Sequence, residues 1–268
     1  MIIISSRQDF NDPDTLSING HHIKDIDLDN DSISNNMGIA ALLDKIRNKK
    51  VLMLVHGYNN EQLEVYDAYQ IINKNIDRIL PTEYDYIIGY SWPGGNHGRD
   101  WWGAKSRSNS VARLFRTLLE TLANSTLHLD LMSHSLGARV CMKALKETPV
   151  TALVRNYFCT APAPAIDNEC LEPDEEFFNS VVSCGRVFIF HSTHDGILRL
   201  TYQSAEKDRA LGLHGPEDVD YISSIADTVY VANCKKHVKK HGGYKNSNAI
   251  YKYMKKYQVA NPAKFLTL

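Results

Sequence analysis

The chain has 268 residues, of which 43% are hydrophobic and 23% charged, and its formal net charge is −1. This composition is ordinary for a globular protein and argues against a disordered chain or a role carried by overall charge. No apolar run approaches the roughly 18 residues of a membrane span, and Met1-Ile2-Ile3-Ile4 is too short for a signal peptide. Because no Pro/Gly/Ser-rich linker interrupts it, we expect a single domain over residues 1–268.

Charged residues are unevenly distributed along the chain. Seven aspartates lie within the first 31 residues, whereas residues 228–268 contain nine lysines and no carboxylate. Such a block is usually a solvated face, and the alternative is contact with an anionic substrate or a membrane surface. It lacks interleaved arginines, so we expect no nucleic-acid partner. The five cysteines include no C-x-x-C pair, which favours reduced thiols and a cytoplasmic protein.

The first half of the chain begins with scaffold elements. Residues 1–50 are predicted to form a strand at 2–4, an acidic Asn/Asp-rich loop and a helix near 37–48. The apolar run 51–55 opens the remaining core, residues 51–268, and its continuous hydrophobicity indicates a central strand buried on both faces.

Strands and helices alternate through the rest of the chain. Helices are predicted at about 61–79, 104–124 and 136–146, and strands at 86–92, 127–132, 157–159, 187–190 and 229–232. This alternation predicts right-handed βαβ crossovers and a mostly parallel sheet with helices on both faces. Ligands of such sheets bind beyond the carboxyl ends of the strands, so the loops that follow the strands are the candidate site.

One of these loops is a tight turn with a serine, Ser133-His134-Ser135-Leu136-Gly137, between a strand and a helix. A serine on such a turn exposes its hydroxyl above the sheet, and the next backbone N–H is free to bind an oxyanion. We therefore interpret Ser135 as a catalytic nucleophile and Leu136 as an oxyanion-hole residue. His134 is expected to pack beneath the turn, because neighbouring side chains there diverge.

A serine hydroxyl is a poor nucleophile at neutral pH and needs a histidine base, usually oriented by a carboxylate. Asp195 follows the strand at 187–190, and Gly196 would permit a tight turn that directs the carboxylate across the sheet. The alternative role for Asp195 is to cap a helix near 197–205.

Two histidines after the last predicted strand are candidate bases. His241 is favoured because it precedes the flexible Gly242-Gly243, whereas His237 lies in a lysine-rich stretch typical of an exposed turn. The remaining alternative for both is a surface histidine.

The strand at 51–55 is followed by His56-Gly57-Tyr58, which offers a second oxyanion-hole donor. The Tyr58 N–H is the expected donor, and Gly57 would let the backbone pass close to the reacting centre. Removal of one such donor typically costs about 3–4 kcal/mol of transition-state stabilisation.

Three tryptophans lie at the end of the strand at 86–92 or in the loop after it and are candidate substrate contacts: Trp92, Trp101 and Trp102. The alternative is partly buried packing. The stretch 161–184 is too short for a large lid, so we expect an open cleft and little or no cap domain. The sequence contains neither a Gly-rich phosphate loop nor a metal-ligand cluster, so we expect no cofactor and no metal.

The order Ser135, Asp195, His241, with His56-Gly57-Tyr58 upstream, resembles the α/β-hydrolase superfamily from about residue 50 onward. Four motifs are also similar to those of a bacterial group of α/β-hydrolases of unestablished function: Val55-His56-Gly57-Tyr58-Asn59, Ser91-Trp92-Pro93, Ser133-His134-Ser135-Leu136-Gly137 and Ala210-Leu211-Gly212. The resemblance implies the α/β-hydrolase fold and a serine-hydrolase triad, but no particular substrate. The chain departs from the superfamily pattern at Ser133, where the turn usually begins with glycine.

We therefore expect a serine hydrolase that cleaves a small-molecule carboxylic ester through an acyl-enzyme, as a carboxylesterase or lipase does. One alternative is an acyltransferase or thioesterase that uses the same site. Another is a binding or scaffold protein that retains the fold and has weak chemistry.

Overall fold

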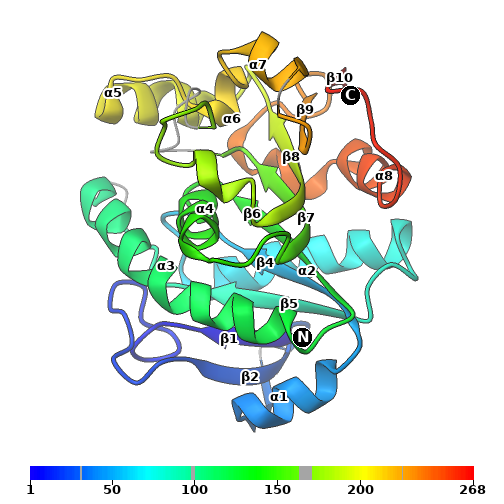
Figure 1. Cartoon of the computed structure of the whole chain (residues 1–268). Helices are drawn as coiled ribbons and strands as arrows, with labels where there is room; N and C mark the ends of the chain where they lie inside the picture. Colours follow the sequence, from blue (N-terminus) through cyan, green and yellow to red (C-terminus); the bar gives the residue numbers. More distant parts are fainter. Residues whose placement is uncertain (31, 98–99, 163–170, 225) are drawn as a thin grey trace.

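The computed structural model describes residues 1–30, 32–97, 100–162, 171–224 and 226–268. Within these ranges, the strands form one sheet in the order β10-β9-β8-β7-β6-β4-β5-β1-β2-β3 (Figure 1). The strands are β1 (Ile2–Ser5), β2 (His22–Asp27), β3 (Ser32–Met37), β4 (Lys50–Val55), β5 (Tyr86–Ser91), β6 (His128–His134), β7 (Val154–Thr160), β8 (Cys184–His191), β9 (Val229–Asn233) and β10 (Phe265–Thr267). All neighbours from β10 to β1 pair in parallel, whereas β1–β2 and β2–β3 are antiparallel. The predicted mostly parallel sheet is confirmed.

Helices cover both faces of this sheet. The helical segments are α1 (Ile39–Ile46), α2 (Gln62–Ile79), α3 (Trp101–Ala123), α4 (Gly137–Glu147), η1 (Phe178–Ser180), η2 (Leu198–Tyr202), α5 (Gln203–Glu206), α6 (Leu211–His214), α7 (Val219–Ser224), η3 (His241–Asn246) and α8 (Asn248–Lys256). One hydrophobic cluster packs α1, α3 and α4 against one face, and a second packs α2 and α8 against the other. Figure 1 shows α3 and α4 side by side on the near face.

Helix α2 shows how the sequence produces one of these layers. Glu61 and Glu64 form a reciprocal capping box that satisfies free N–H groups at its start. Val65, Tyr69 and Ile72 recur at helical spacing and are buried. The Tyr69 hydroxyl also lies 3.0 Å from both the backbone nitrogen of His56 and the carbonyl oxygen of Leu54, so α2 fixes the end of β4.

The acidic loop expected between the first strand and the first helix contains β2 and β3, which form an antiparallel hairpin at the sheet edge. In β2, Ile23 and Ile26 are the buried hydrophobic side chains. A polar edge hairpin of this kind resembles a loop in sequence because it contributes few apolar residues to the core.

The order in which successive strands are added to the sheet reverses between the parallel strands β4 and β6. From β4 the chain passes through α2 to β5 on one side, and from β6 it passes through α4 to β7 on the other. The register pairs Val55 of β4 with Ser133 of β6, so the two strands end at the same level. Such a switch point leaves a crevice at the carboxyl ends, where ligands of open α/β sheets bind.

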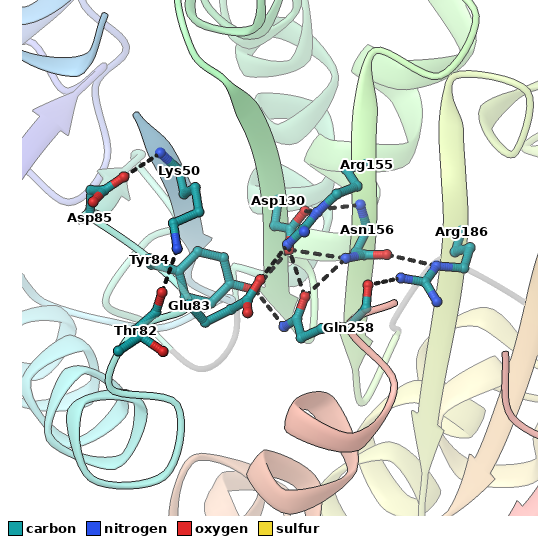
Figure 2. Close-up of polar contacts among 10 residues, drawn as sticks. All are labelled: Lys50, Thr82, Glu83, Tyr84, Asp85, Asp130, Arg155, Asn156, Arg186 and Gln258. Atoms are coloured by element: carbon teal, nitrogen blue, oxygen red, sulfur yellow. Dashed lines mark hydrogen bonds and ion pairs between the residues drawn. The ribbon is translucent and has the colours of Figure 1, made fainter. Parts of the chain in front are cut away.

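At the opposite side of the sheet, where the amino ends of the parallel strands lie, a buried polar network is centred on Asp130 of β6 (Figure 2). Asp130 is fully buried and accepts hydrogen bonds from Arg155 Nε at 2.8 Å, from the Asn156 backbone N–H at 3.1 Å and from the Tyr84 hydroxyl at 2.8 Å. Arg155 Nη2 also donates to the Gln258 side chain at 2.9 Å. The network, which we call the Asp130 network, joins the loop before β5 and the segment after α8 to the sheet.

In the described part of the chain, no helix is long and apolar enough to cross a membrane. Cys141, Cys159, Cys184 and Cys234 are buried free thiols. Cys170 lies outside the described residues.

Candidate active site

Strand β6 ends at His134 and α4 begins at Gly137, so Ser135 and Leu136 form the turn between them. Ser135 has a φ of +55°, a left-handed conformation that costs a non-glycine residue about 1–2 kcal/mol. Its backbone N–H donates to the Thr160 carbonyl at 3.1 Å, and its carbonyl accepts from the Ala138 N–H at 3.0 Å. The serine therefore occupies a strained turn that β7 and α4 hold in place.

Two glycines let the loops after β4 and β6 approach each other. A Cβ on Gly137 would lie 2.3 Å from the His56 carbonyl oxygen, and one on Gly57 would lie 2.9 Å from the Ser135 Cβ. A larger residue at either position would push the loop away from Ser135. The expected close approach at Gly57 is present. At Gly196 an added Cβ would meet nothing within 4 Å and φ is not left-handed, so the turn after Asp195 does not depend on glycine at this position.

The two expected oxyanion donors differ in how they are held. Leu136 is completely buried at the start of α4, while Tyr58 lines the cavity described below. The next residue, Asn59, donates its N–H to the Gly94 carbonyl at 3.2 Å, which anchors this loop. Among the described residues, no acceptor binds the backbone N–H of Leu136 or Tyr58.

Asp195 and His241 are in direct contact. The fully buried Asp195 places Oδ2 2.8 Å from His241 Nδ1, and its Oδ1 accepts the Leu198 N–H at 3.1 Å. One carboxylate thus makes both contacts that the sequence offered as alternatives, the helix cap and the histidine. His237 is exposed, and the structure does not bring it to Asp195.

His134 supports the segment that carries His241. Its Nε2 donates to the His241 carbonyl oxygen at 3.0 Å, and the two ring centroids are 4.6 Å apart. Burial, together with the nearby His241, lowers the pKa of His134 to about 3, so the ring is neutral. A neutral ring that donates from Nε2 is the Nε2–H tautomer. The sequence-based prediction that His134 packs beneath the turn did not include this contact with His241.

A cavity of about 390 Å³ lies at the carboxyl ends of β4 and β6. Ser135, His134 and His241 all line it, so the turn and the Asp195–His241 pair meet in one space. In the part of the chain that the structure describes, no group binds the second ring nitrogen of His241. The volume lies within the roughly 300–1,000 Å³ range of small-molecule pockets.

The three tryptophans occupy different environments. Trp101 lines the cavity and packs edge-on against Tyr58, with ring centroids 5.5 Å apart. Trp92 is fully buried and donates its indole N–H to the His56 carbonyl at 2.8 Å, so it lies in the core and not in the cavity wall. Trp102 is 58% exposed and is not a lining residue. We therefore retain only Trp101 as a proposed substrate contact.

Ser133, where the superfamily usually has glycine, is almost fully buried. Its Oγ lies 2.7 Å from the Tyr157 hydroxyl and 3.8 Å from Cys159 Sγ. The additional hydroxyl has a partner on β7 and leaves Ser135 free of a competing hydrogen bond from its neighbour.

In the residues described, no group of three or more His, Cys, Asp or Glu side chains is arranged to hold a metal ion. Within the expected cap position, 161–184, residues 163–170 lie outside the described residues. The described remainder contains the short η1 helix and the first residue of β8.

The parallel sheet, the helices on both faces and the serine turn after β6 define an α/β-hydrolase fold. A family model described as alpha/beta hydrolase of unknown function (DUF900) matches residues 31–254, and the chain belongs to this family.

Several solved structures resemble the chain at low sequence identity. A candidate hydrolase of the alpha/beta superfamily from Xanthomonas campestris is 12% identical, covers 78% of this chain and 99% of its own, and has a TM-score of 0.42. A candidate alpha/beta hydrolase from Agrobacterium tumefaciens is 14% identical, covers 79% of this chain and 85% of its own, and has a TM-score of 0.43. A gene product of Listeria innocua is 8% identical, covers 82% of this chain and 99% of its own, and has a TM-score of 0.46. A search of curated proteins found no match.

Proposed function

We propose that the chain is a serine hydrolase that cleaves a carboxylic ester, with Ser135 as nucleophile, His241 as base and Asp195 as its orienting acid. The observation that carries the proposal is the shared cavity: Ser135 and His241 both line it, and His241 Nδ1 is bound to a buried carboxylate. Occupation of Nδ1 leaves Nε2 to accept the serine proton.

In the proposed reaction, Ser135 Oγ attacks the ester carbonyl carbon while His241 Nε2 accepts the hydroxyl proton. The N–H groups of Leu136 and Tyr58 stabilise the resulting oxyanion. Collapse of this intermediate breaks the bond to the alcohol oxygen, which takes the proton from His241, and leaves an acyl-enzyme. Water then attacks the acyl group, gives one proton to His241 and releases the acid as that proton returns to Ser135.

Two further features support the wider proposal. Four buried free thiols are compatible with a reducing compartment, so we retain the cytoplasm as the proposed location. One sheet includes strands from both ends of the chain, which supports a single domain over residues 1–268.

A fluorophosphonate probe on the wild type and on Ser135→Ala tests the proposal. We expect labelling of Ser135 in the wild type and none in the variant. Hydrolysis of p-nitrophenyl hexanoate should fall by about 10⁶-fold, the order of magnitude expected when a serine hydrolase loses its nucleophile. Absence of labelling in folded wild-type protein would overturn the proposal and favour a binding or scaffold protein.

The base is tested with His241→Gln and the matched control His237→Gln. The His241 change should abolish turnover, whereas the exposed His237 should be replaceable without loss. The opposite result would reject the assignment of His241.

A further inference from the structure

The cavity beside Ser135 is lined by basic side chains and, among the described residues, by no acidic ones. Its lining residues include three histidines and one lysine: His56, His134, His241 and Lys245. No aspartate or glutamate is among the described lining residues. Burial lowers the pKa of His56 and of His134 well below the usual range, so both are neutral near pH 7. Among the described lining residues, Lys245 is thus the one lysine or arginine, and no carboxylate accompanies it.

The backbone of Lys245 is held on two sides. Its carbonyl oxygen accepts hydrogen bonds from the Asn75 side chain at 3.2 Å and from the Tyr251 hydroxyl at 2.8 Å. Within the described ranges, no carboxylate forms an ion pair with its ammonium group. Lys245 lines the same cavity as Ser135, His134 and His241.

One side of the same cavity is aliphatic. Leu54, Ala68, Ile72 and Met132 line this part, which we call the recess. Ile72 precedes Asn75 by less than one turn of α2, and Asn75 binds the Lys245 carbonyl. The recess and Lys245 therefore line one cavity, and α2, which supplies part of the recess, also contacts the backbone of Lys245.

We propose that the substrate is an ester with a short aliphatic chain that fills the recess and ends in an anionic group, a carboxylate or a phosphate, bound by Lys245. This inference rests on the proposed function and names its substrate class. A charge-assisted hydrogen bond to an ammonium group is stronger than a neutral one, and an anionic ligand supplies the counter-charge that the cavity lacks.

Two esters of equal chain length test the proposal by turnover: p-nitrophenyl hexanoate and the mono-p-nitrophenyl ester of hexanedioic acid. The wild type should show a higher kcat/KM for the acidic ester. Lys245→Met should lower the ratio of the two kcat/KM values by at least about tenfold, as expected for a lost hydrogen bond to a charged group. Lys245→Arg should preserve the preference.

Lys252→Met is the matched control, because it removes the same charge from an exposed position on α8 that does not line the cavity. It should leave both rates unchanged. A change in the ratio equal to that of Lys245→Met would show a general charge effect and overturn the proposal.

Protection of Ser135 from the fluorophosphonate probe gives a readout that does not need turnover. Hexanoate or hexyl phosphate should protect the wild type at lower concentration than hexan-1-ol does, and Lys245→Met should remove this difference. Protection by hexanoate alone identifies a carboxylate, and protection by hexyl phosphate alone identifies a phosphate. Equal protection by all three compounds would overturn the proposal.

The two proposals fail in different ways. Wild-type protein that is neither labelled nor active on either ester rejects the hydrolase, and the substrate class with it. Wild-type protein that is labelled and hydrolyses the hexanoate ester, with no preference for the acidic ester, rejects only the role of Lys245.

Discussion

Two aspartates, Asp130 and Asp195, are completely buried at opposite ends of the same sheet, and their surroundings differ. Around Asp130, Arg155, Asn156 and Tyr84 donate to the carboxylate and close it off within the protein. Asp195 instead has His241 as its partner, and that ring lines an open cavity. A buried carboxylate thus stabilises the fold where all its partners are internal, and can serve chemistry where its partner faces a ligand space.

The two partners also differ in how they carry charge. Burial alone would lower the pKa of the Arg155 guanidinium, but the hydrogen bonds that it donates to the carboxylates of Asp130 and Glu83 raise this pKa above its usual value, so the ion pair is permanent. An imidazole changes its charge near neutral pH and can transfer a proton. The chain leaves β4 and β6 toward opposite sides of the sheet, and His241 lines the cavity at the carboxyl ends of these two strands, where a ligand can bind.

The largest difference should come from Asp195→Asn. An amide cannot stabilise the imidazolium or hold the correct tautomer, so kcat on p-nitrophenyl hexanoate should fall by about 10⁴-fold. The melting temperature, measured in parallel, checks that the variant is folded. A decrease of less than tenfold would contradict the role proposed for Asp195.

Asp130→Asn should produce the reverse pattern. Its amide group would face the donors of Arg155 and Asn156, and removal of one partner from a buried ion pair costs about 3–5 kcal/mol. Urea unfolding should show this loss, while Ser135 labelling per folded molecule stays unchanged. The control Asp85→Asn, at an exposed position of the same edge, should lose much less stability. Equal losses would mean that burial of Asp130 is unimportant.

Stability should also depend on the buried neutral histidines. Burial lowers the pKa of His134 to about 3 and that of His191 to about 4, below the unfolded value of 6.5. The unfolded chain therefore binds more protons in this window, so the stability present above pH 6.5 is lost as the pH falls toward 4. Each such histidine should contribute about 1.4 kcal/mol per pH unit.

Urea unfolding between pH 7 and 5 measures this slope. His134→Gln should reduce it by one histidine's contribution, whereas His237→Gln, at an exposed position, should leave it unchanged. A slope that is the same in all three proteins would show that His134 does not stay neutral in the fold.

The smallest effect is expected from the strained turn itself. Ser135→Gly relieves the left-handed φ at the cost of extra backbone entropy, so the free energy of unfolding should rise by about 0.5–1 kcal/mol while labelling is lost. Ala152→Gly, at another left-handed position away from the cavity, should raise stability without loss of labelling. A destabilised Ser135→Gly variant would show that the turn is not strained.

Much of the fold follows from short stretches of sequence. The continuous apolar run before His56 predicted β4, and the strand–serine–helix pattern predicted the turn at Ser135, because both depend on contacts close in sequence. Edge strands β2 and β3 were missed because they contribute few apolar side chains to the core, and their pairing, of β1 with β2 and of β2 with β3, is not visible in their own sequence pattern.

By itself, the sequence determined the alternation of strands and helices and the family, and it supplied the candidate Ser135, Asp195 and His241. Only the tertiary structure decided that Asp195 contacts His241 and not His237, that Trp92 is a core residue, and that Lys245 lines the cavity beside Ser135 with no ion-pair partner in the described part of the chain. Local patterns set backbone conformation, whereas these three outcomes depend on which side chains meet across elements far apart in the chain.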